Sequence, residues 1–151
     1  MLNKDYKEML QILLKNKVKF LVVGAYALGA HGYPRATGDL DIWIEASLAN
    51  SKRMYRSLSE FGAPLFELTP DTFTAKGIIF QIGVAPRRID IITMINGVDF
   101  GRAYSGRQDI LINDIMVPFI SKKDLIKNKE STGREKDRLD AECLRKAGQN
   151  S

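Results

Sequence analysis

The chain has 151 residues and a formal charge of +5 at pH 7, from 23 lysines and arginines against 18 aspartates and glutamates. It contains one histidine, His31, and one cysteine, Cys143. These single residues exclude an intrachain disulfide and a zinc site built from several Cys or His ligands, and a histidine-based nucleophilic mechanism would have to run through His31. A metal ion would need oxygen ligands, which favours magnesium, manganese or calcium.

The length predicts a single domain over residues 1–151 that is large enough to bury a hydrophobic core. The charged N-terminus lacks the apolar stretch of a signal peptide, and the longest apolar-rich run, residues 20–30, is too short to span a bilayer. We therefore expect a cytoplasmic protein without a membrane partner. The basic excess suits partners that carry phosphate.

The first half of the chain predicts helices alternating with strands. Asn3 is expected to cap a helix that runs to Lys15, because apolar residues recur there at helical spacing. The other elements expected in this half are a buried strand over 18–23, a short helix over 25–30, a turn at 32–34, a strand over 39–44, a helix that starts at Ser47 and ends at 62–64, and a helical turn from 69–71.

The second half predicts mostly strands, followed by a helical tail. The elements expected are a hairpin of strands 78–84 and 88–94 joined by 85–87, short strands over 108–113 and 115–119, a helix from Ser121 to about residue 132, a break at Gly133, and a helix over 134–146. This order predicts an α/β (α+β) domain, in which helices flank a twisted mixed sheet. The core would span about 17–119 and the tail about 121–147.

Asp39 and Asp41 are the first residues that indicate chemistry. On a strand they would lie on one face with Cβ atoms about 6–7 Å apart, where the two carboxylates repel each other and a divalent cation between them removes that cost. Asp90 lies in a second apolar strand, and pairing of the two strands would bring all three carboxylates together. The alternative for such a short motif is an acidic, solvent-facing strand.

Gly24 and Ala25 join a buried strand to a helix. A glycine at such a junction lets a ligand approach the backbone, and the free amides of a helix N-terminus attract phosphate. Alone this is an ordinary strand-to-helix turn. Its position before the aspartates makes the combination more specific.

Residues 20–25 (FLVVGA), 37–42 (TGDLDI) and 89–91 (IDI), in that order, resemble the DNA polymerase β-like nucleotidyltransferase superfamily. The resemblance is closer to its small bacterial members, which include nucleotidyltransferases of toxin–antitoxin and abortive-infection systems. Further matching residues are 30–32, 35–37 and 129–137. The resemblance extends from about Val18 to Leu144 and implies the nucleotidyltransferase fold.

The resemblance also implies roles for the residues that match. Gly24, with Ala25 beside it, would border a nucleoside triphosphate. Asp39, Asp41 and Asp90 would hold two Mg²⁺ ions, with Mn²⁺ as a substitute, and Asp90 would help to activate an acceptor hydroxyl. Two metals can stabilise the attacking and leaving oxygens without a histidine. Ala25 departs from the usual Gly-Ser or Gly-Gly pair and lacks the hydroxyl that would contact phosphate.

Four more residues complete the candidate nucleotide site. Arg35 would balance the carboxylates or contact phosphate, with a solvated loop arginine as the alternative, and Thr37 would fix the loop through a backbone hydrogen bond. In the resembling proteins the tail folds over the cleft and a lysine reaches the triphosphate. Lys129 is the first candidate for that lysine and Lys136 the second, while a solvated helix face is the alternative.

Three further positions have both a structural and a functional interpretation. His31 is interpreted as a packing or capping residue, with a supporting role near the site as the alternative. Trp43 would stack on a base or pack at the sheet edge. Arg87 and Arg88 would lie on a hairpin or bind an acceptor nucleic acid.

The leading hypothesis is a magnesium-dependent nucleotidyltransferase that moves a nucleoside monophosphate from an NTP to a hydroxyl of RNA, tRNA included, or of protein. A toxin with a partner antitoxin is a specific version, and a small-molecule acceptor is a variant. The alternative is a catalytically weak or inactive module that binds nucleotide or nucleic acid with the same fold. The departure at Ala25 favours that alternative.

Overall fold

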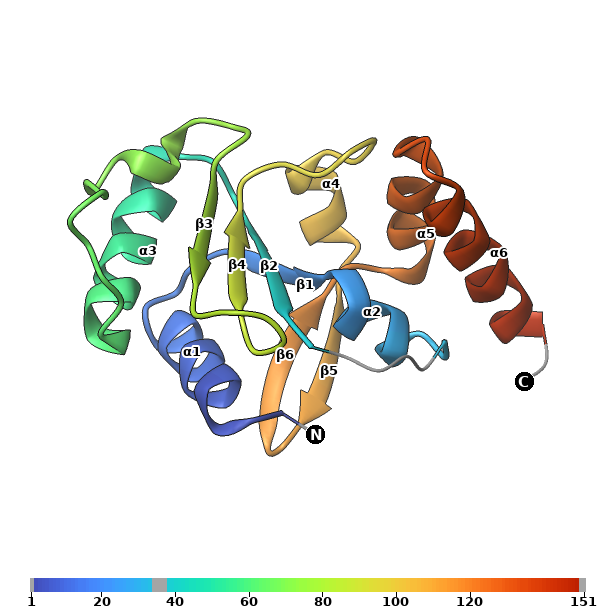
Figure 1. The fold of residues 1–151 in the computed structure, drawn as a ribbon, viewed down its shortest axis with the longest axis horizontal. Coiled ribbons are helices and arrows are strands. Elements are labelled where there is room, and N and C mark those ends of the chain that lie inside the picture. The colour runs from blue at the N-terminus through green and yellow to red at the C-terminus, as the bar shows by residue number, and fades with distance from the viewer. Residues whose placement is uncertain (1, 34–37, 150–151) are drawn as a thin grey trace.

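A six-stranded mixed sheet forms the centre of the computed structural model, which describes residues 2–33 and 38–149 (Figure 1). The strands lie in the order β3-β4-β2-β1-β6-β5. The strands are β1 (Phe20–Val23), β2 (Leu40–Ile44), β3 (Ile79–Ile82), β4 (Ile89–Ile92), β5 (Gln108–Ile112) and β6 (Ile115–Phe119). The helices are α1 (Lys4–Lys15), α2 (Gly24–Ala30), α3 (Leu48–Phe61), α4 (Phe100–Ser105), α5 (Lys122–Ser131), α6 (Glu135–Gln149) and a 3₁₀ turn at Thr72–Thr74.

The helices begin where the sequence predicts caps. The side chains of Asn3, Ser47 and Ser121 each accept a hydrogen bond from a backbone N–H in the first turn of α1, α3 and α5. Gly62 ends α3 with φ +89°, a left-handed conformation that glycine adopts without steric cost. The predicted mixed α/β fold with a helical tail is therefore confirmed, and the element boundaries shift by only a few residues.

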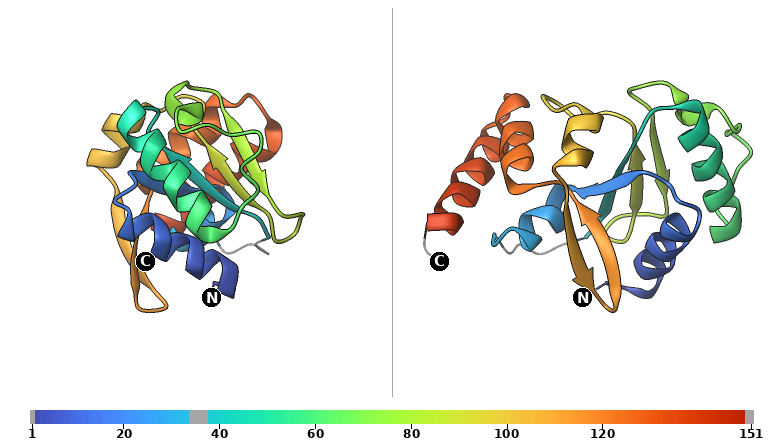
Figure 2. Two further views of the ribbon diagram at one scale, coloured as in Figure 1. Left: turned by 90° about the vertical axis from the view of Figure 1, so that its left-hand side faces the viewer. Right: turned by 180° about the vertical axis from the view of Figure 1, so that it is seen from behind.

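The sheet combines antiparallel and parallel pairs. β1 pairs antiparallel with β2 and parallel with β6, while β2 runs parallel to β4. β3 and β4 form one hairpin, and β5 and β6 form another. The helices α1 and α3 lie at one end of the molecule, and α5 and α6 pack together at the other end (Figures 1 and 2).

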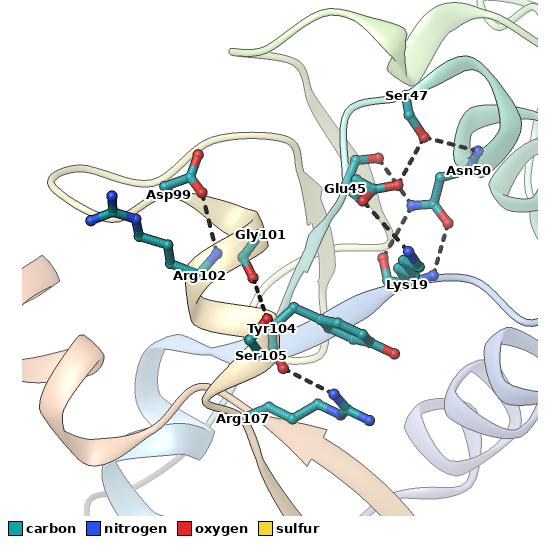
Figure 3. Close-up of polar contacts among 10 residues, drawn as sticks. All are labelled: Lys19, Glu45, Ser47, Asn50, Asp99, Gly101, Arg102, Tyr104, Ser105 and Arg107. Carbon is teal, nitrogen blue, oxygen red and sulfur yellow. Dashed lines mark hydrogen bonds and ion pairs between the residues drawn. The ribbon is translucent and has the colours of Figure 1, made fainter.

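A buried amide joins the first two strands to α3. The Asn50 side chain accepts a hydrogen bond from Lys19 N (2.8 Å) and donates to Lys19 O (3.1 Å) and Glu45 O (3.0 Å), as Figure 3 shows. Asn50 is fully buried, and these bonds satisfy its polar atoms. The bonds fix the start of β1 against the end of β2, and thereby the register that places the candidate site at the opposite end of these strands.

The structure adds one helix and corrects the placement of one residue. No element was predicted between the strands at 88–94 and 108–113, where α4 forms and Asp99 caps it by accepting a hydrogen bond from Arg102 N (Figure 3). Trp43 neither stacks on a base nor lies at a sheet edge. It is 2% exposed on the central strand β2, where its ring meets Phe100 of α4 edge-to-face with 5.0 Å between centroids. This packing stabilises a helix whose own sequence is a weak helix former.

Among the described residues, no helix is both long enough and apolar enough to cross a membrane.

Candidate active site

The two strands that carry aspartates lie side by side. β2 and β4 are parallel, and their register places Asp41 directly beside Asp90. On its other side Asp41 pairs with Val23, the last residue of β1, so that Gly24 and the start of α2 follow immediately. The sheet thus aligns the glycine turn with two of the three candidate carboxylates. The predicted pairing of the aspartate strands is confirmed.

Gly24 makes room for the Asp41 carboxylate. Its φ of +69° lies in the left-handed region, and a Cβ at this position would overlap Asp41 Oδ2 and lie 3.0 Å from Asp41 Cγ. Both the backbone angle and the space therefore require glycine. The main chain at the end of β1 directly borders the carboxylate.

Arg88 binds two of the three aspartates. Its guanidinium Nε donates to Asp90 Oδ1 (2.7 Å) and Nη2 to Asp90 Oδ2 (3.1 Å), while Nη2 lies 3.2 Å from Asp39 Oδ2. Its backbone N–H donates to Asp39 Oδ1 (2.9 Å). Neither interpretation of Arg88 from sequence included these contacts. The spacing Arg-x-Asp at the start of an extended segment, which places both side chains on one face, is the signal that could have found the contact with Asp90.

The charge of this cluster is not balanced. Burial, followed by the neighbouring carboxylates Asp90 and Asp39, raises the pKa of Asp41 to about 7, although Arg88 opposes the shift. One guanidinium faces three carboxylates, so ionisation of Asp41 is opposed by burial and by its acidic neighbours. A cation beside Asp41 would relieve this repulsion.

A buried tyrosine holds the loop before β2 in place. The Tyr6 hydroxyl from α1 donates to Gly38 O (2.6 Å) and lies 3.3 Å from Arg88 O. Burial, together with the neighbouring Tyr26 and Asp39, raises the pKa of Tyr6 to about 12, so the hydroxyl remains a donor. The sequence predicted Tyr6 only as a member of an apolar helix face. Its bond positions the backbone next to Asp39 and Arg88.

The tail carries a second charged cluster. Lys129 Nζ lies 3.3 Å from Asp137 Oδ1 and 3.5 Å from Asp140 Oδ2, and Arg134 Nε donates to Asp137 Oδ2 (2.7 Å). Thr132 also donates to Asp137 Oδ2 (2.7 Å). Burial alone raises the pKa of Asp137, but the bonds from Thr132 and Arg134 and the charge of Lys129 outweigh it, and the net pKa is lowered. The cluster joins α5 to α6.

Two open cavities lie between the sheet and the tail. One has a volume of about 280 Å³ and the other about 350 Å³, and both are lined by Gly24, Asp41, Lys129, Arg134 and Asp137. Ala25 and Lys136 line the second cavity. The structure therefore brings together five of the residues predicted for nucleotide binding or metal binding: Gly24, Ala25, Asp41, Lys129 and Lys136.

The other predicted residues are placed differently. Asp39 and Asp90 lie beside Asp41 but are bound by Arg88 and line neither cavity. Arg35 and Thr37 lie outside the described residues. His31 caps α2, and its Nε2 lies 2.7 Å from Ile120 O, a structural contact between α2 and the chain before α5.

The carboxylate oxygens suit a hard divalent cation, and the uncompensated charge at Asp41 is the physical reason for one to bind. Within residues 2–33 and 38–149, however, no three acidic, cysteine or histidine side chains are gathered as metal ligands. The guanidinium of Arg88 contacts Asp39 and Asp90 where such a cation would need them.

This architecture, with two aspartate strands beside a glycine turn and a helical tail over the cleft, is the nucleotidyltransferase fold. TM1012 from Thermotoga maritima, provisionally assigned as a nucleotidyltransferase, superposes with a TM-score of 0.64 at 17% identity, over 100% of this chain and 97% of its own. Lincomycin-bound LnuA, a lincosamide antibiotic adenylyltransferase, gives 0.59 at 17% identity, over 97% and 98% of the two chains. The antibiotic-resistance factor ANT(2'')-Ia gives 0.56 at 13% identity, over 97% and 90%. No protein-family model and no curated protein sequence matches the chain.

Proposed function

We propose that the protein is a metal-dependent nucleotidyltransferase, which moves a nucleoside monophosphate from an NTP to an acceptor hydroxyl. The observation that carries this proposal is the position of Asp41, which lies against the Gly24 backbone and beside Asp90 and faces cavities lined by cationic tail residues. The new bond joins the acceptor oxygen to the α-phosphorus. The bond to the β-phosphate oxygen breaks, and pyrophosphate leaves.

The three aspartates and three basic residues of the tail would have separate roles in this reaction. Asp39, Asp41 and Asp90 would hold two Mg²⁺ ions, with Mn²⁺ as a substitute, and these would neutralise charge on the attacking and leaving oxygens. Lys129, Arg134 and Lys136 line the cavities and would contact the triphosphate. The backbone at Gly24 and Ala25 would border the phosphates. Asp90 would accept the proton of the acceptor hydroxyl.

The proposed acceptor is RNA, with tRNA as the specific candidate. A third cavity of about 380 Å³ adjoins the first one and shares Ile95 with it. Lys76, Arg102 and Lys127 line this cavity, and Asp99 is its one acidic residue. Such a surplus of positive charge favours a polyanion over a cationic antibiotic or an average protein surface. A cytoplasmic toxin whose cleft is covered by a partner antitoxin is the biological form that we propose for this activity.

The test is incorporation of labelled NTPs in the presence of Mg²⁺, with total RNA, total protein and lincomycin as separate acceptor pools and pyrophosphate release as the readout. Asp41→Asn should lower the rate by about 10³-fold or more, because it removes a group that acts on the transition state. Asp109→Asn, an exposed aspartate on β5 paired with Arg107, is the matched control and should keep full activity.

Wild-type protein that binds NTP but releases no pyrophosphate with any pool would support the inactive binding module instead. Transfer to total protein, or to lincomycin, in the absence of transfer to RNA would replace the proposed acceptor.

A further inference from the structure

Arg88 engages every carboxylate oxygen of two candidate metal ligands. Asp39 Oδ1 accepts from the Arg88 backbone N–H, and Asp39 Oδ2 lies 3.2 Å from Nη2. Asp90 Oδ1 and Oδ2 accept from Nε and Nη2 at 2.7 and 3.1 Å. The Asp90 pair is the two-pronged, charge-assisted geometry that makes arginine–carboxylate contacts strong and directional.

We propose that Arg88 is a resident counter-cation that competes with divalent metal for Asp39 and Asp90, so that the metal site is completed only when the guanidinium leaves. This inference rests on the proposed metal dependence and adds the residue that controls it. It explains why the three aspartates, although aligned by the strands, are not gathered as ligands in the structure.

Metal and guanidinium exclude each other for electrostatic reasons. Mg²⁺ binds carboxylate oxygens at about 2.0–2.1 Å and demands near-octahedral geometry. A guanidinium held at 2.7–3.2 Å from those same oxygens would place a second positive charge within a few ångströms of the ion. Since the Asp90 side chain is only 13% exposed, water screens this repulsion poorly.

The guanidinium of Arg88 is held from one side only. The Arg88 backbone is fixed to β2, because its carbonyl accepts a hydrogen bond from Leu40 N (2.9 Å), but its side chain is 30% exposed, which gives the guanidinium a path into solvent. Within the described residues Asp41 forms neither a hydrogen bond nor an ion pair with Arg88, and it faces the cavities, so it is the carboxylate that an arriving cation meets first. Metal bound at Asp41 then competes with Arg88 for Asp90, the neighbouring residue in the register.

The test is direct Mn²⁺ binding, measured from the electron paramagnetic resonance signal of free Mn²⁺, without nucleotide and without any activity assay. Arg88→Gln should lower the Mn²⁺ dissociation constant by about tenfold or more, since it removes a charge-assisted bidentate competitor. Arg88→Lys keeps the positive charge but loses the two-pronged hydrogen bonding of the guanidinium. Its Mn²⁺ dissociation constant should therefore lie between those of Arg88→Gln and the wild type.

Arg87→Gln is the matched control. Arg87 is the adjacent residue and is exposed, and its side chain makes no ion pair within the part of the chain that the structure describes. The substitution removes the same charge from the same turn, so it should change the dissociation constant by no more than about twofold. A gain of equal size in both variants would reduce the effect to general charge and overturn the proposal.

A second measurement uses the wild-type protein and does not depend on the folding of any variant. The Arg88 side-chain Nε–H signal, assigned in nuclear magnetic resonance spectra by its loss in Arg88→Lys, should shift and exchange faster with water as Mg²⁺ is added. A signal that stays unchanged while Mg²⁺ binds would overturn the proposal. Unchanged or weaker Mn²⁺ binding by folded Arg88→Gln would do the same and leave the proposed function intact. If neither the wild type nor any Arg88 variant bound Mn²⁺, both the proposed role of Arg88 and the proposed metal-dependent function would be overturned.

Discussion

Two charged clusters meet at the same cavities, the strand cluster through Asp41 and the tail cluster through Lys129, Arg134 and Asp137, and they differ in their balance of charge. The strand cluster consists of Asp39, Asp41, Arg88 and Asp90, in which one cation faces three carboxylates. The tail cluster consists of Lys129, Arg134, Asp137 and Asp140, in which two cations face two carboxylates.

The difference between the clusters is visible in the pKa values of Asp41, which is partly buried, and Asp137, which is buried. In the strand cluster, burial and like charges raise the pKa of Asp41 to about 7. In the tail cluster, the pKa of Asp137 is lowered despite its burial, because donors and cations surround it. A balanced cluster stabilises the fold, whereas an unbalanced one creates a demand for an external cation. The proposed metal site lies in the cluster whose charge is not balanced.

The largest effect on stability should come from the tail cluster. Asp137→Asn removes the carboxylate that pairs with the buried Lys129, and should lower the free energy of unfolding by about 3 kcal/mol, as expected when one partner of a buried ion pair is lost. Chemical denaturation at pH 7 measures it. Glu135→Gln, which breaks the exposed pair with Arg138, should have a much smaller effect, because water screens that pair. Equal losses in the two variants would remove the contrast between the clusters.

An intermediate effect should come from the strand cluster and should have the opposite sign. Because the pKa of Asp41 is higher in the folded than in the unfolded protein, the folded state holds a proton between about pH 4 and pH 7 that the unfolded state has released, and this contribution to stability is lost as pH rises through that window. In the presence of a chelator, Asp41→Asn should therefore be more stable than wild type above pH 7, by roughly 2 kcal/mol. Denaturation from pH 4 to pH 8 measures the difference. Parallel pH profiles would show that Asp41 carries no uncompensated charge.

The smallest effect should come from a residue that lines a cavity but belongs to neither cluster. Lys136 is exposed, and within the described residues it makes no ion pair. Lys136→Gln should weaken NTP binding by about threefold and change stability by less than about 0.5 kcal/mol, the behaviour of a solvent-exposed phosphate contact. Equilibrium binding and thermal unfolding measure the two quantities. Lys129→Gln should weaken NTP binding and also lower stability. If the two lysine variants lost the same amount of stability, Lys129 would have no structural role in the tail cluster.

Most of the fold and part of the candidate site could be predicted from the sequence. Caps such as Asn3 and Ser47 act within one turn, so local residues predict them. The sequence offered the pairing of the two aspartate strands only as a condition for gathering the carboxylates, and the register of β2 and β4 supplies it. The burial of Trp43 could not be predicted, because it depends on the strand order and on α4, a helix for which no element was predicted.

The contacts of Arg88 and Tyr6 were also beyond local patterns. Tyr6 reaches the loop at Gly38 across 32 residues of chain, and the choice of partner depends on where α1 packs. Arg88 and Asp90 are close in sequence, but the additional bonds to Asp39 depend on the parallel register of β2 and β4, which places Leu40 beside Ile89. Side chains that complete a site from a distance are fixed by tertiary structure, which periodicity and spacing do not encode.

The absent side chain at Gly24 has a consequence for how this site can vary. The space between the end of β1 and the Asp41 carboxylate is smaller than one methyl group. A single added carbon atom would overlap the carboxylate that the strand register brings beside Asp90, so either that carboxylate or the main chain would have to shift. The position of Asp41 therefore depends on the backbone contour of a neighbouring strand, in addition to the charges that surround it.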